Sequence, residues 1–76
     1  MTNDQLARIA EIAEQLEGFA LELRELHEEE ELSYEESSDD YKEGEEGDTA
    51  VEHLTALIAA ASAIENAHTE LSVFAA

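Results

Sequence analysis

The chain has 76 residues, enough for one small domain, and it contains no cysteine, which excludes the disulfides and zinc-thiolate sites that often stabilise such domains. Its 21 acidic and 3 basic residues give a formal net charge of -18, which argues against direct binding to nucleic acid or anionic membranes and favours a basic partner. Hydrophobic residues make up 43% of the sequence, so the chain can still fold.

The first predicted element is an amphipathic helix over residues 3 to 31. Its apolar positions recur at spacings of three and four, as in a coiled-coil seam: Ile9, Ile12, Leu16, Phe19, Leu23 and Leu26. Thr2 or Asn3 can cap its start. Gly18, which costs about 1 kcal/mol relative to alanine inside a helix, indicates either a close helix crossing or a weak point.

Residues 32 to 48 are predicted to form a long acidic connector. The acidic segment, defined as residues 28 to 48, holds 12 acids and one lysine for a net charge of -11, whereas residues 1 to 27 carry -4 and residues 49 to 76 carry -3. Repulsion within Glu28 to Glu31 opposes helix formation there. We expect either a functional loop or a partly helical continuation of the first helix.

A second helix is predicted over residues 49 to 73, with Asp48 or Thr49 as its cap. Its larger apolar residues follow helical spacing: Val51, Leu54, Leu57, Ile58, Ile64, Leu71 and Phe74. Six alanines between Ala56 and Ala67 allow another helix to approach closely. The predicted fold is therefore a single all-α domain over residues 1 to 76, a two-helix antiparallel hairpin.

Both apolar stripes are wider than one helix-helix contact can cover. A lone hairpin would expose an apolar patch that monomers seldom tolerate. Homodimerisation into a four-helix bundle removes this patch by symmetry. We therefore expect a homodimer, the alternative being a surface reserved for another protein.

Catalytic motifs and phosphate-binding loops are absent from the sequence, so we expect neither an enzyme nor a bound cofactor. The run from Asp39 to Glu46 has acidic residues spaced somewhat as in an EF-hand calcium-binding loop, but Lys42 occupies a ligand position. One sharper alternative is a metal site at Glu65-Asn-Ala-His68, completed by Glu11 or Glu14 of the first helix. In this motif alone the chain resembles the encapsulated ferritins, whose two-helix subunits dimerise around iron, which implies a di-iron site.

His27 and His53 are predicted to approach each other near the connector end of the hairpin. There they would bind a divalent ion or act as a pH-sensitive contact. The alternative interpretation is two surface imidazoles in a strongly negative field.

The clustering of acids favours a dedicated binding surface over a general solubilising or halophilic coat, because 12 of the 21 acids fall within 21 residues. A fully helical segment would carry about one carboxylate per 2.6 Å, against about one charge per 1.7 Å for duplex DNA. A basic groove for DNA or RNA could accept such a surface. The predicted partner-binding residues are Glu28, Glu29, Glu30, Glu31, Tyr34, Glu35, Glu36, Asp39, Asp40, Tyr41, Glu43, Glu45, Glu46 and Asp48.

The run from Tyr34 to Asp48, followed by a helix containing Ile64-Glu-Asn-Ala67, resembles the small acidic helical-hairpin proteins of phages and prophages. This resemblance is one of architecture and composition. It implies a phage protein acting on a host machine, of the kind that includes DNA mimics blocking CRISPR effectors, restriction enzymes or transcription factors.

No membrane span or targeting segment is predicted. The sequence lacks the roughly 18 consecutive apolar residues of a membrane helix, and its first residues lack the basic and apolar regions of a signal peptide. We expect a soluble, cytoplasmic protein.

Overall fold

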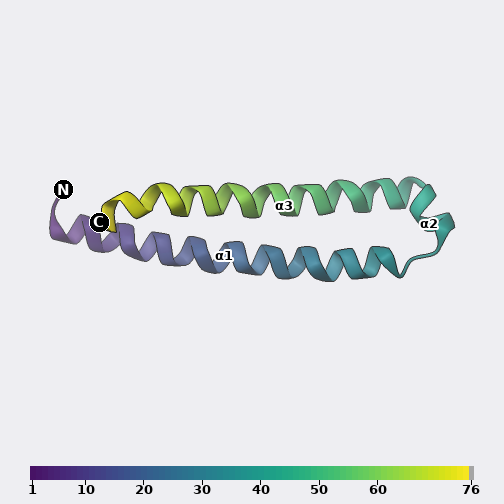
Figure 1. The fold of residues 1–76 in the computed structure, drawn as a ribbon, viewed down its shortest axis with the longest axis horizontal. Coiled ribbons are helices and arrows are strands. Elements are labelled where there is room, and N and C mark those ends of the chain that lie inside the picture. The colour runs from purple at the N-terminus through teal and green to yellow at the C-terminus, as the bar shows by residue number, and fades with distance from the viewer. Residues whose placement is uncertain (76) are drawn as a thin grey trace.

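The computed structural model describes residues 1–75 and forms a helical hairpin. Helix α1 (Asn3–Glu35) leads to a short connector helix, α2 (Asp39–Glu43), and α3 (Glu45–Leu71) returns antiparallel to α1 before a final 3-10 turn, η1 (Ser72–Ala75). Figure 1 shows the two long helices side by side, with both ends of the chain at one end of the hairpin and α2 at the other. The predicted all-α hairpin is confirmed.

Helix α1 begins where the sequence predicts, at a capping box. The Thr2 hydroxyl accepts a hydrogen bond from the Gln5 backbone N–H at 3.1 Å, and the Thr2 N–H donates to the Gln5 side chain at 2.9 Å. Two N–H groups that the helix itself leaves unpaired are thereby satisfied. Asp4 adds a negative charge where the helix dipole favours one.

The connector is partly helical, which is the second of the two expectations, and its boundaries differ from the predicted ones. Helix α1 continues to Glu35, four residues beyond its predicted end, and α3 begins at Glu45, four residues before its predicted start. Gly44, not Asp48 or Thr49, is the N-cap of α3. Like-charge pairs on a helix each cost only a few tenths of a kcal/mol. This repulsion is too weak to end α1 at residue 31 or to delay the start of α3 to residue 49. The acids of the first turn of α3 are moreover stabilised by its dipole.

Gly47 allows α2 and the start of α3 to pack closely at the end of the hairpin. It lies buried in the first turns of α3, and a β-carbon added there would fall well inside van der Waals contact with the backbone carbonyl oxygens of Tyr41 and Lys42. Only a residue without a side chain lets α3 pass so close to the end of α2. Ser38 supports this turn by capping α2, its hydroxyl accepting from the Tyr41 N–H at 3.2 Å.

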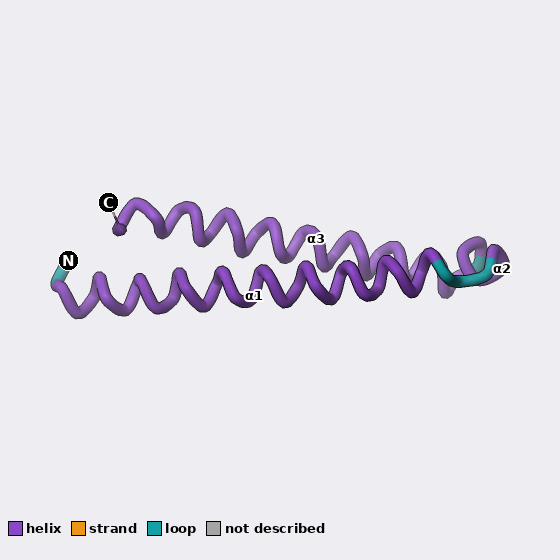
Figure 2. The backbone as a smooth tube through the Cα atoms, turned by 60° about the horizontal axis from the view of Figure 1, so that its bottom comes forward, coloured by secondary structure: helices purple, strands orange, loops and turns teal. Residues whose placement is uncertain are grey.

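The contact between α1 and α3 is made by small residues and half-buried leucines. Ala20, Ala50 and Ala61 are the buried apolar residues of the described chain, and no large side chain within it is fully buried. The hairpin measures 58 × 15 × 14 Å, with a radius of gyration of 17.3 Å against about 11 Å for a compact domain of this length. Figure 2 shows that α1 and α3 are inclined to each other rather than strictly parallel. A single chain therefore has almost no core.

Gly18 does not mark a crossing of α1 with α3. It is exposed, and a β-carbon built on it meets no atom within 4 Å. The prediction of a close crossing is therefore wrong within the chain, because Gly18 lies on the side of α1 opposite to Ala20. Gly18 is the weak point of the helix.

Candidate functional site

The acidic segment forms the closed end of the hairpin. Eleven of its twelve acids are exposed and Glu30 is half-buried. At a rise of about 1.5 Å per residue, the part of α1 from Glu28 to Glu35 and the reversal beyond it occupy roughly the last 20 Å of the 58 Å hairpin. Because the segment folds back on itself, its density is about one carboxylate per 1.7 Å, that of duplex DNA, and higher than predicted for a straight helix.

Lys42 is the only cation of this segment, and its ammonium group does not pair with a carboxylate. Its Nζ donates to the backbone carbonyl oxygen of Glu35 at 3.1 Å and lies 5.6 Å from the centre of the Tyr34 ring. The lysine therefore ties α2 to the end of α1 by a hydrogen bond and a cation–π contact. Within residues 1–75, no Lys or Arg side chain forms an ion pair with the acids of the segment.

The two tyrosines predicted as partner anchors are both half-buried. Tyr34 lies beneath Lys42, and Tyr41 borders a hollow together with Glu30, Glu45 and Glu46. Each tyrosine therefore holds the closed end together and still presents part of its ring to the surface.

Arg24 and Glu65 form an ion pair across the two long helices that the sequence pattern did not predict. The Arg24 Nε donates to Glu65 Oε2 at 2.8 Å and its Nη2 donates to Oε1 at 2.5 Å, a two-point contact. This hydrogen bonding lowers the pKa of Glu65 and raises that of Arg24. The signal in the sequence that could have predicted this pair is the presence of opposite charges at exposed positions that flank the apolar stripes of the two helices.

This pair predicts an acid-dependent contribution to stability. Because the folded chain lowers the pKa of Glu65, the contribution is present above the ordinary pKa of glutamate, about 4.3, and is lost as the pH falls through the lowered value. We expect Glu65→Gln to lower the melting temperature slightly at about pH 7 and to have no effect at about pH 2. Circular dichroism melts of both proteins across this range measure the difference, and a difference independent of pH would contradict the assignment.

The alternative metal site is not assembled in the single chain. Within residues 1–75, no group of three His, Cys, Asp or Glu side chains is placed to hold a metal ion. Glu65 is held by Arg24, and the Nε2 of His68 lies 3.9 Å from the carboxylate of Glu17. Glu14 is exposed, because Ala13 and Ala20 are the residues that turn towards α3. Glu14, Glu65 and His68 are therefore not brought together as a set of ligands within residues 1–75 of one chain.

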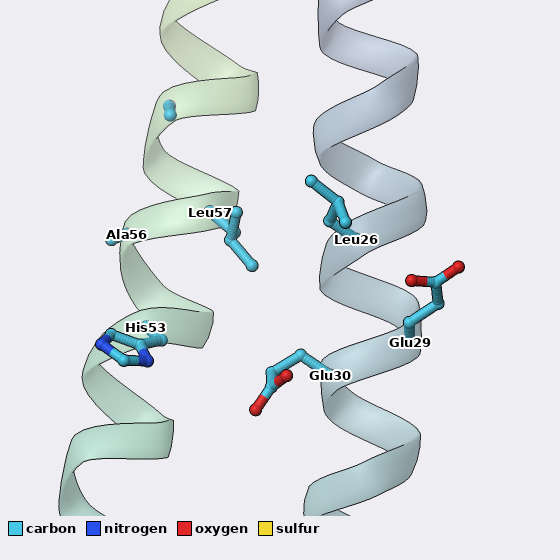
Figure 3. Close-up of a pocket in the computed structure, with 7 residues that line it drawn as sticks. Leu26, Glu29, Glu30, His53, Ala56 and Leu57 are labelled. Carbon is cyan, nitrogen blue, oxygen red and sulfur yellow. The ribbon is translucent and has the colours of Figure 1, made fainter.

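The predicted approach of His27 to His53 also yields no metal cluster within residues 1–75. His27 Nδ1 lies 3.5 Å from the Glu31 carboxylate one turn along its own helix. His53 of α3 and Glu30 of α1 line the same groove from opposite helices (Figure 3). His27 thus has a carboxylate as its neighbour, and His53 shares a groove with Glu29 and Glu30, an arrangement compatible with the alternative interpretation of two imidazoles in a negative field.

An apolar groove of about 520 Å³ adjoins the acidic segment. Leu26 of α1 and Ala56, Leu57 and Ala60 of α3 line it, with Glu29, Glu30 and His53 at its edge. Figure 3 shows Leu26 and Leu57 turned towards each other between the helices, with Glu30 on the side of the closed end. The groove shows that the apolar stripes of the two helices do not cover each other completely.

Comparison with protein-family models, with curated proteins and with solved structures gives no match to this chain. Within the described residues, no helix has both the length and the apolar character needed to cross a membrane.

Proposed function

We propose that the protein is a non-enzymatic binding module that presents the acidic segment to a basic surface of another protein. The basic surface is one that otherwise binds nucleic acid, so the module acts as a DNA mimic and inhibits its partner by competition. One observation carries this proposal: the twelve carboxylates of the acidic segment, eleven of them on helices, are gathered at DNA-like density, and the one lysine of the segment, Lys42, is engaged by Glu35 and Tyr34.

Most of these acidic residues are held on helices, and this supports a specific binding surface over a flexible solubilising tail. Long flexible acidic tails lose conformational entropy when they bind. Here Ser38, Lys42 and Gly47 fix the reversal through backbone contacts. Charge at fixed positions can match the spacing of lysines and arginines in a groove, which favours fast, salt-sensitive association.

We also propose that the module works as a homodimer, a four-helix bundle of two hairpins. The chain exposes 5793 Å², whereas a compact monomer of 8.4 kDa exposes about 4,600 Å². A second copy would cover much of this excess. Sedimentation equilibrium measures the state directly, and a mass of 8.4 kDa at all accessible concentrations would contradict the dimer.

The function is tested by competition. Immobilised protein is exposed at low salt to a lysate of the cells that contain it, and bound proteins are then eluted with duplex DNA. We expect elution of a nucleic-acid-binding protein, because DNA and the acidic segment would occupy the same basic surface. Retention of every bound protein in the presence of excess DNA, or the absence of any bound protein, would contradict the proposal.

A further inference from the structure

Three large apolar side chains form a ridge along α1. Ile12, Phe19 and Leu26 are seven residues apart and therefore lie on one side of the helix. They are 50%, 53% and 50% exposed. The ridge extends over about 21 Å at the helical rise per residue. The three side chains therefore form a continuous apolar stripe rather than isolated exposed residues.

A trough runs beside the ridge on α3. Its floor consists of Ala56, Ala60, Ala63 and Ala67, which are spaced by four, three and four residues and so lie on one side of that helix. Leu26 lines the same groove as Ala56 and Ala60, which places ridge and trough on one face of the hairpin (Figure 3). We call this face, defined by these seven residues, the ridge-and-trough face.

We propose that the ridge-and-trough face binds a second copy of the chain, with both acidic segments at the same end of the dimer. A two-fold axis parallel to the hairpin lays the ridge of each copy in the trough of the other, so large side chains meet alanines. A two-fold axis across the hairpin instead sets ridge against ridge and trough against trough, which leaves voids. Complementarity of size therefore selects the first arrangement.

The area of the face suits this role. The side of the hairpin that carries the face extends over about 58 by 15 Å, so a second copy laid along its whole length could bury the roughly 800 Å² that each partner buries in a standard interface. The face also carries three of the five exposed large apolar residues of α1, whereas the acids Glu29 and Glu30 line the groove near the closed end. It is thus a surface on which two copies of a highly acidic chain can approach.

This arrangement rests on the proposed function and sharpens it, because the dimer then presents two acidic segments of net charge -11 side by side. The partner would meet a doubled acidic surface. Repulsion between the two segments opposes assembly and is screened by salt. Self-association should therefore tighten as the salt concentration rises, opposite to the behaviour of partner binding.

Matched charge substitutions on the two sides of α1 test the face. Phe19→Glu should weaken self-association by a factor of about 100 or more, because it would bury an unpaired charge. Leu21→Glu adds the same charge at a residue that is 59% exposed and lines a different hollow, with Glu65 and Thr69, and should leave the dimer intact. Sedimentation equilibrium distinguishes them. Equal weakening by both, or weakening by Leu21→Glu alone, would overturn the proposal.

A distance measurement tests the orientation without disturbing the interface. Because the chain has no cysteine, Glu36→Cys allows a spin label at an exposed residue of the acidic segment. We expect a label-to-label distance much shorter than the 58 Å hairpin; a distance near that length would overturn the arrangement. A dimer with separated segments that still binds its partner contradicts this arrangement alone, whereas the expected dimer without partner binding contradicts the proposed function alone.

Discussion

Gly47→Ala is expected to destabilise the hairpin by about 3 kcal/mol. The new methyl group would collide with the carbonyl oxygens of Tyr41 and Lys42, which are backbone atoms and cannot rotate away. The closed end would have to open, separating α2 from the start of α3 and disordering the acidic segment. Thermal and urea unfolding, followed by circular dichroism, measure the loss.

Gly18→Ala is the matched control for this substitution. The same added methyl group meets no atom within 4 Å at an exposed position inside α1. It should stabilise the protein by up to about 1 kcal/mol, through helix propensity alone. Two substitutions of the same kind thus have opposite expected signs. A neutral Gly47→Ala, or a destabilising Gly18→Ala, would contradict the packing described here.

Neutralising four acids of the acidic segment is expected to weaken partner binding by a factor of about 100 or more, if each charge contributes about 0.7 kcal/mol. The variant changes Glu35 and Glu36 to glutamine and Asp39 and Asp40 to asparagine. It should melt at a higher temperature than the wild type, because repulsion within the segment is reduced. Titration against the DNA-eluted partner, together with a circular dichroism melt, measures both effects.

A second fourfold variant separates position from total charge. Glu11, Glu14, Glu25 and Glu70 are exposed and lie outside the acidic segment, and their conversion to glutamine changes the net charge by the same amount. This variant should bind the partner nearly as well as the wild type. Equal losses in the two variants would mean that only the total charge matters, and unchanged binding in both would exclude the acidic segment as the contact.

Helical periodicity predicted the long helices well because each carries its signal locally. The seam from Ile9 to Leu26 and the capping box at Thr2 are both legible without tertiary context, and the hairpin follows from them. The acidic composition likewise identified the candidate surface. These features depend on spacing along one helix, which a sequence displays directly.

The conformation of the closed end involves contacts between different helices, and the spacing of apolar residues along one helix does not predict these contacts. The helical course of residues 32 to 35 and 45 to 48 is accompanied by the hydrogen bond from Lys42 to the Glu35 carbonyl and by the close passage at Gly47. Local repulsion among glutamates was therefore overestimated as a helix breaker. Similarly, the phase of α1 places Glu17, not Glu14, beside His68, so the three predicted ligands are not assembled within residues 1–75 of one chain.

The dependence of partner affinity on salt tests the central claim most directly. If the acidic segment replaces nucleic acid in a basic groove, the logarithm of the dissociation constant should rise steeply and linearly with the logarithm of the NaCl concentration, and duplex DNA should compete. Isothermal titration of the DNA-eluted partner from about 50 to 200 mM NaCl, the range over which such contacts weaken by orders of magnitude, provides the measurement. An affinity that does not change with salt would contradict the account.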